Sequence, residues 1–159
     1  MSEPLIPTTA EIIQKVQSAK AKFLQWDSDL LEINVNERTM THKLAEYLQQ
    51  EFVGWNVDCE YNRNINDEKW LPQPPEGTVG REFWQDSDAK TVFPDIIVHQ
   101  RRTNTNILVI EAKKSSNRDR GAWDETKLRA FKNPPYNYLA SLFVKFLVAP
   151  DHGIEIREL

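Results

Sequence analysis

Two short apolar runs of the sequence carry charged residues at one end. Asp95 lies near the start of the run Phe93–Val98, and the run Ile107–Lys113 ends with Glu111 and Lys113. Charged side chains are uncommon in buried strands unless they are paired, bound to a metal or functional. Two carboxylates and a lysine that converge at one edge of a sheet could hold a divalent cation and activate a water molecule beside it.

The strand pattern predicts how these residues meet. Side chains alternate across a strand, so Glu111 and Lys113 should share one face, while Ala112 offers its backbone carbonyl as a candidate ligand. The connection Arg102–Asn106 is short and turn-like, which predicts an antiparallel hairpin. Because the start of one hairpin strand lies beside the end of the other, we expect Asp95 close to Glu111 and Lys113.

Oxygen ligands of this kind indicate a hard divalent cation. Mg²⁺ is typically held by one or two carboxylates together with water and substrate phosphate, and Mn²⁺ prefers similar ligands. Lys113 could then orient the attacking water or stabilise the charge that develops on a phosphate. A solvated strand end is the simpler interpretation of Glu111, Ala112 and Lys113 alone, but Asp95 and the surrounding elements favour the functional one.

Two further charged residues occur where a helical pattern predicts apolar ones. Glu37 begins the apolar stripe of a helix expected over 37–52, and Lys127 lies between two aromatic residues of the stripe expected over 119–132. Glu37 also has a simpler explanation, because an acid in the first helical turn contributes about 0.3–1 kcal/mol. The stem of Lys127 could cover apolar surface while its ammonium group reaches water. Both interpretations stay open for each residue.

The remaining pattern predicts an α/β protein. Thr8 and Glu11 form a capping box that starts a first helix, and Asn36 caps the second. Strands are expected over 57–61, 93–98, 107–113, 139–148 and 154–158. This order describes a single domain over residues 1–159, with one central mixed sheet flanked by helices. Residues 1–35 would be an extra N-terminal helical extension, and the polar, proline-containing residues 62–90 a long loop or insertion.

Composition limits the class of protein. The chain has 159 residues, a net charge of −4 and one cysteine, Cys59, which fits a reducing cytoplasm and excludes an intramolecular disulfide. No apolar run approaches the roughly 20 residues of a membrane helix, and no signal peptide is recognisable. We therefore expect a cytoplasmic protein without a membrane association.

Positive charge is concentrated in one part of the chain. Residues 100–132 contain nine basic and four acidic residues, a local net charge of +5. A basic region on an acidic protein can bind a phosphate backbone. On charge alone, a solvated surface of mixed charge is the preferred interpretation.

The motif residues together resemble the signature of the PD-(D/E)xK nuclease superfamily, the restriction-endonuclease-like proteins. Pro94-Asp95, fifteen intervening residues and Glu111-Ala112-Lys113 match that signature. The order helix, three strands, helix, strand matches its αβββαβ core over roughly residues 36–148. Shorter stretches at 37–45, 58–63, 94–99 and 124–128 resemble a small, poorly characterised bacterial branch of the superfamily.

The resemblance implies a metal-dependent endonuclease that hydrolyses phosphodiester bonds, most often in DNA. Asp95 and Glu111 would bind Mg²⁺ together with the Ala112 carbonyl, with Mn²⁺ as a substitute, and Lys113 would be the catalytic lysine. Small members of the superfamily often act as homodimers.

The resemblance also implies roles for the two helical residues. Glu37 would be the acidic residue that many members carry on the helix before the sheet, helping with the metal, directly or through water. Lys127 matches a lysine that some members place on the following helix, near the site.

Two alternatives to an enzyme stay open. The chain could be a catalytically silent nuclease-like module that binds nucleic acid or a protein partner. It could also be a regulatory or immunity-type interaction protein that uses its acidic surface.

Overall fold

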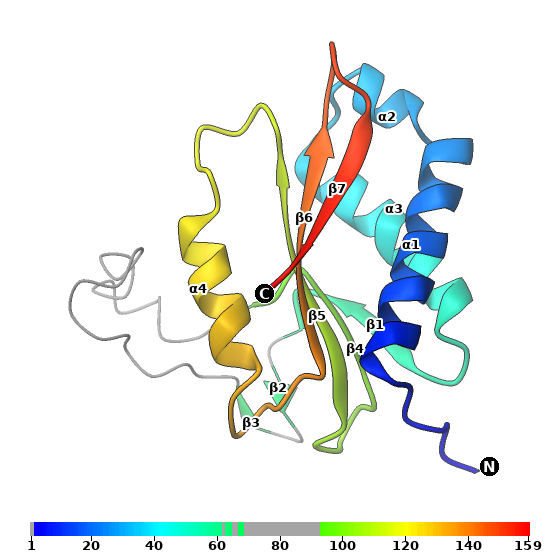
Figure 1. Ribbon diagram of the computed structural model, residues 1–159, viewed down its shortest axis with the longest axis vertical. Coiled ribbons are helices and arrows are strands. Elements are labelled where there is room, and N and C mark those ends of the chain that lie inside the picture. Colours follow the sequence, from blue (N-terminus) through cyan, green and yellow to red (C-terminus); the bar gives the residue numbers. More distant parts are fainter. Residues whose placement is uncertain (1, 62, 65–66, 69–92) are drawn as a thin grey trace.

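The computed structural model describes residues 2–61, 63–64, 67–68 and 93–159 (Figure 1). Most of the loop or insertion expected over 62–90 therefore lies outside the described residues. Only the short strands β2 (Arg63–Asn64) and β3 (Asp67–Glu68) are described there, and they pair with each other.

The central sheet has five strands in the order β1-β4-β5-β6-β7. These strands are β1 (Asn56–Cys59), β4 (Ile96–His99), β5 (Asn106–Lys114), β6 (Ala140–Leu147) and β7 (Gly153–Glu158). Strands β5 and β6 are parallel and the other neighbours are antiparallel, so the sheet is mixed, as predicted. The predicted hairpin of β4 and β5 is confirmed, with a register shift between Val98 and His99.

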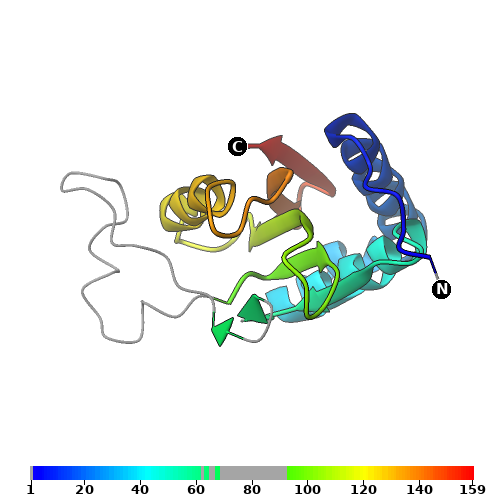
Figure 2. The same ribbon diagram turned by 90° about the horizontal axis from the view of Figure 1, so that it is seen from below.

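Helices cover both faces of this sheet (Figures 1 and 2). On one face lie α1 (Thr9–Trp26), the short α2 (Asp29–Glu32) and α3 (Glu37–Glu51), and on the other lies α4 (Ala122–Phe131). Helix α4 forms the crossover that a parallel β5–β6 pair requires. Within the described residues, no helix is both long enough and apolar enough to cross a membrane.

The helix starts follow local chemistry, with one exception. Thr8 and Glu11 form the predicted capping box of α1, and the Asn36 side chain accepts a hydrogen bond from the backbone N–H of Arg38 at the start of α3. The prediction that the last helix begins near residue 119 was wrong. Asp119 instead accepts from the backbone N–H of Gly121, whose φ of +83° delays the start of α4 to Ala122.

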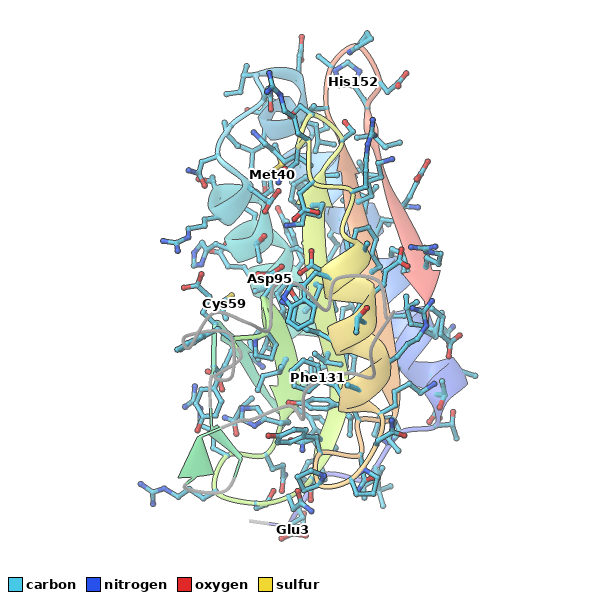
Figure 3. The ribbon with its side chains drawn as sticks, turned by 90° about the vertical axis from the view of Figure 1, so that its left-hand side faces the viewer. Glu3, Met40, Cys59, Asp95, Phe131 and His152 are labelled. Atoms are coloured by element: carbon cyan, nitrogen blue, oxygen red, sulfur yellow. The ribbon has the colours of Figure 1, made fainter. Side chains whose placement is uncertain are left out.

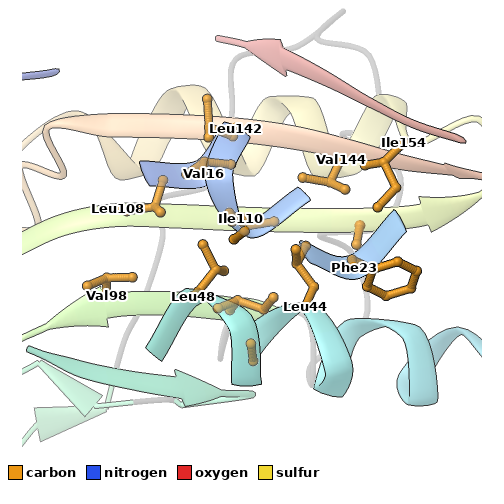
Figure 4. Close-up of a cluster of buried hydrophobic side chains, with 14 of the residues drawn as sticks. Val16, Phe23, Leu44, Leu48, Val98, Leu108, Ile110, Leu142, Val144 and Ile154 are labelled. Atoms are coloured by element: carbon orange, nitrogen blue, oxygen red, sulfur yellow. The ribbon is translucent and has the colours of Figure 1, made fainter. Parts of the chain in front are cut away.

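Strand β5 is the centre of the core, as its two apolar faces predicted. Residues Ile107 to Ile110 are fully buried. Ile107, Leu108 and Ile110 belong to the core cluster under α1 and α3, and Val109 belongs to the cluster under α4. Figure 4 shows aliphatic side chains of the sheet packed against Val16 and Phe23 of α1 and Leu44 and Leu48 of α3. Because each such side chain contributes about 1.5–3 kcal/mol on burial, α1 is an integral part of the core.

Strand β5 extends beyond its neighbour β4. The β4–β5 pairing ends at Ile96 opposite Ile110, whereas β5 stays paired with β6 as far as Lys114. Among the described strands, none therefore pairs with the β4-facing edge of residues Glu111–Lys114. The candidate site is built on this open edge.

Candidate active site

Two carboxylates take the place of a strand along the open edge of β5. Asp95 Oδ2 accepts a hydrogen bond from the backbone N–H of Ala112 at 2.7 Å, and Glu37 Oε2 accepts one from that of Lys114 at 2.9 Å. Buried backbone N–H groups require such partners. In an extended strand the N–H and C=O of one residue point to the same edge, so the Ala112 carbonyl faces the same side as Asp95.

The side chains of Asp95 and Glu111 meet across the hairpin, as the sequence predicted. Figure 3 shows Asp95 between α3 and α4, and the Glu111 carboxyl, only 2% exposed as a residue, donates a hydrogen bond to it. Burial raises the pKa of Glu111 well above its usual value, against the opposing effect of the Lys127 ammonium. Burial also raises the pKa of Asp95, whose hydrogen bonds from Ala112 and Glu111 oppose the shift. The pair thus resembles carboxyl groups that share a proton.

A chain of ion pairs continues from Glu111 over the α4 face. Lys127 Nζ lies 3.0 Å from Glu111 Oε1 and 3.1 Å from Asp124 Oδ1. Lys113 Nζ in turn lies 3.2 Å from Asp124 Oδ2 and 3.2 Å from Asp119 Oδ2. Carboxylates and ammonium groups therefore alternate from Glu111 to Asp119, and each lysine of this chain lies between two carboxylates.

Both lysines are held in the charged form. Burial by itself lowers the pKa of Lys127 and of Lys113, but their carboxylate neighbours outweigh it, and both pKa values are raised. The principal carboxylate is Glu111 for Lys127 and Asp124 for Lys113. Because it stays protonated at neutral pH, Lys113 can donate hydrogen bonds but cannot act as a general base.

Asp124 was missed as a site residue. It is 6% exposed and bridges Lys113 and Lys127, although it lies on a helix rather than a strand. The available signal was its spacing from Lys127, since residues three apart share one face of a helix. With Lys127 already assigned to the inward stripe, Asp124 had to lie beside it.

The site opens to solvent on the α3 side. A cavity of about 330 Å³ is lined by Glu37, Glu60 and Asp95 together with residues of α3 and Cys59. Glu60 donates its backbone N–H to the Asp95 carbonyl and pairs with Arg38 at 3.3 Å. Glu37 therefore borders the same cavity as Asp95, and its carboxylate accepts hydrogen bonds from the Lys114 backbone and from the Asn117 amide.

The donor groups suit a divalent cation held mainly by two carboxylates. Among the described residues, no three acidic, histidine or cysteine side chains are grouped closely enough to hold a metal by themselves. Glu111 Oε1 is buried, and its neighbour there is the Lys127 ammonium at 3.0 Å. Asp95, Glu111 and the Ala112 carbonyl are hard oxygen donors, and Mg²⁺ commonly uses one or two carboxylates and completes its shell with water. These residues fit such an ion.

A separate charged cluster joins β1 to β4 away from this site. His99 Nε2 lies 2.8 Å from Asp58 Oδ2, and Arg101 forms a two-pronged ion pair with the same carboxylate. His99 is 2% exposed and its ring also contacts Tyr61. The cluster lies near the closed end of the hairpin, and its contacts anchor the edge strand β1.

Comparison of the chain with protein-family models, with curated proteins and with solved structures gave no match.

Proposed function

We propose that the chain is a metal-dependent endonuclease of the PD-(D/E)xK type that hydrolyses phosphodiester bonds, with DNA as the expected substrate. One observation carries the proposal: the carboxyl groups of Asp95 and Glu111 touch at the open edge of β5, two residues before a charged lysine. Carboxylates and an ammonium group so arranged are suited to phosphoryl chemistry, in which catalysis is mostly positioning and charge stabilisation.

The element order supports the same proposal. Apart from β2 and β3, which form a separate two-stranded sheet between β1 and β4, the elements α3, β1, β4, β5, α4 and β6 follow the order αβββαβ. The parallel β5–β6 pair is bridged by α4. Helix α1 and strand β7 would then be additions to a restriction-endonuclease-like core. Asp95 directly precedes β4, and Glu111 and Lys113 lie near the end of β5. Because β4 and β5 are antiparallel, these residues share one end of the two strands.

The proposed metal ligands are Asp95, Glu111 and the Ala112 carbonyl, with Mg²⁺ as the cofactor and Mn²⁺ as a substitute. When bound, such an ion lowers the pKa of a coordinated water and neutralises charge on the phosphate. Lys127 holds the Glu111 carboxyl in place and Glu37 holds the end of β5, so both are positioning residues.

Lys113 has a different role in this proposal. Asp124 and Asp119 hold its ammonium group from two sides, so three rotatable donors are kept at the site with little freedom. Since it stays protonated, it donates hydrogen bonds to the attacking water or to a phosphoryl oxygen. Its replacement should therefore reduce kcat more than it weakens binding of the nucleic acid.

A plasmid-nicking assay tests the proposal. Wild-type protein should nick supercoiled DNA in Mg²⁺ or Mn²⁺ and be inactive in EDTA, and Asp95→Asn, Glu111→Gln and Lys113→Ala should each lose at least about a hundredfold in rate. Asp58→Asn and Lys43→Ala remove a carboxylate and an ammonium outside the site and should retain activity. Equal cleavage rates of wild type and Asp95→Asn on duplex DNA, single-stranded DNA and RNA would reject the proposal that the protein is a nuclease.

One observation favours a second candidate, a catalytically silent module that binds nucleic acid or a protein. The Lys127 ammonium already lies beside Glu111 and Asp124, so the acidic cluster is partly neutralised without a metal. Salt-dependent DNA binding with no cleavage in any divalent cation would support this candidate instead.

A further inference from the structure

A second cavity borders Lys113 on the side away from Asp95. It has a volume of about 570 Å³ and lies between the loop 115–121 and the strands β6 and β7. Its lining includes five basic side chains, those of Lys113, Lys114, Arg120, Lys145 and Arg157, against the acids Asp119 and Glu155. Basic residues therefore outnumber acidic ones in the lining, on a protein whose net charge is −4. Lys113 and Arg157 are already paired with acidic residues, and the Lys114 ammonium is bonded to Asn34 and Val35.

Lys145 is the unusual residue of this cavity. It is directly opposite Lys113 in the parallel β5–β6 register, so the two ammonium groups leave the same face of the sheet. Like charges directly opposite one another destabilise a sheet. Lys145 is also half-buried and, within the described residues, forms no ion pair, even with its β7 neighbour Glu155.

A half-buried cation without a counter-charge costs free energy, and a bound anion offsets that cost. Lys113 cannot supply the compensation, and the carboxylates beside it, Asp119 and Asp124, form ion pairs with Lys113 itself. The exposed Arg120 likewise forms no ion pair among the described residues. The side chains of Lys145 and Arg120 are thus available at the edge of the cavity to bind an anion beside Lys113.

The floor of the cavity is apolar. The Phe143 ring lies there, and the Arg157 guanidinium lies over this ring at 5.6 Å from its centre. Gly121 packs so closely on the same ring that an added Cβ would lie 2.5 Å from it. An apolar floor beneath a cationic rim suits a sugar attached to phosphates better than it suits a carboxylate-rich peptide.

We propose that this cavity binds the nucleic-acid strand next to the bond that is cut, with Lys145 and Arg120 on the neighbouring phosphate and the sugar beside Phe143. The proposal deepens the proposed function and rests on it. It makes Lys145 a binding residue, distinct from the catalytic Lys113, although the two are neighbours.

Binding of a fluorescein-labelled DNA duplex in EDTA, at a series of KCl concentrations, tests this assignment without any cleavage. Lys145→Gln should weaken binding roughly tenfold, the loss expected for one charge-assisted contact. It should also lower the slope of log K against log salt by about 1, while Lys145→Arg and the distant control Lys43→Gln stay near wild type. In nicking assays Lys145→Gln should raise KM and preserve kcat.

Lys145→Gln should fold, because it removes the repulsion between residue 145 and Lys113. Its Tm should be no lower than that of wild type. DNA binding and a salt slope unchanged in Lys145→Gln would overturn the cavity assignment while leaving the nuclease proposal intact. DNA binding that depends on Lys145, with no cleavage in Mg²⁺ or Mn²⁺, would support the cavity and reject the enzyme. Absence of DNA binding, with or without binding of polyglutamate, would overturn the nucleic-acid assignment.

Discussion

Lys127 Nζ lies 3.0 Å from Glu111 Oε1, and both side chains are nearly buried, with exposed fractions of 12% and 3%. This pair joins α4 to the end of β5 and holds the Glu111 carboxyl against Asp95. Removal of one partner of a buried pair leaves a charge without compensation, which is more costly than loss of the pair itself.

Lys127→Met should therefore destabilise the fold by about 3–5 kcal/mol. The double variant Glu111→Gln, Lys127→Met should recover part of that loss, since no buried charge is left unpaired. Urea unfolding at neutral pH gives both free energies, with Lys43→Met as an exposed control. Equal stabilities of Lys127→Met and wild type would show that the ion pair does not hold α4 in place.

If Asp95 and Glu111 form the proposed metal site, divalent cations should stabilise the native protein, because only the folded state brings these two carboxyl groups together. At a concentration a hundredfold above Kd, Mg²⁺ should add about 2.7 kcal/mol, and EDTA should reverse the effect. For a domain of this size the corresponding rise in Tm is roughly 5–11 °C. Thermal unfolding of Asp95→Asn and Glu111→Gln should show no such rise, whereas Asp58→Asn should show it in full. A rise of the same size in Asp95→Asn would place the ion elsewhere.

Protonation of Asp58 at acidic pH should weaken the hydrogen bonds and ion pairs by which it joins β1 to His99 and Arg101. Burial by itself raises the pKa of Asp58, but hydrogen bonds from Arg101 and His99 outweigh burial, and the pKa is lowered. A carboxyl group whose pKa is lower in the folded state stabilises the protein above its unfolded pKa of about 3.9. That contribution is lost as pH falls below this value through the folded pKa.

The measurement is the urea midpoint of wild type and Asp58→Asn from neutral to acidic pH. The difference between them should be largest near neutrality and shrink below about pH 4. Glu32→Gln, which removes an exposed carboxyl, serves as the control. A difference that stays constant with pH would mean that Asp58 contributes through packing rather than charge.

Gly121 should tolerate no larger residue. Its φ of +83° is unfavourable for other residues, and an added Cβ would lie 2.5 Å from the Phe143 ring. Gly121→Ala should cost about 2–4 kcal/mol, from backbone strain and overpacking together. Adding Phe143→Leu should relieve the steric part but not the backbone part, as a double-mutant cycle of urea unfolding would show. Strictly additive losses would indicate that the loop and the ring are not in contact.

Local chemistry in the sequence determined much of the fold. The caps at Thr8 and Asn36, the short turn of the hairpin and the apolar faces of β5 each depend on residues close together in the chain, and the structure bears them out. The motif likewise placed Asp95 beside Glu111, because a short turn brings the start of one hairpin strand next to the end of the other. The start of α4 was misjudged because Asp119 can serve either as a helix cap or as a turn residue, and its bond to Gly121 selects the turn.

Contacts between distant segments decided the rest. Glu37 bonds the Lys114 backbone across 77 residues, Asp124 joins two lysines only because α4 packs with that face inward, and Lys145 lies opposite Lys113 only in the observed parallel register. Residue types and spacing determine which elements form and which groups can react. Strand register and helix orientation, by contrast, are set by which packing of the whole core is most stable. That choice depends on contacts between segments far apart in the chain, which a local sequence pattern does not show.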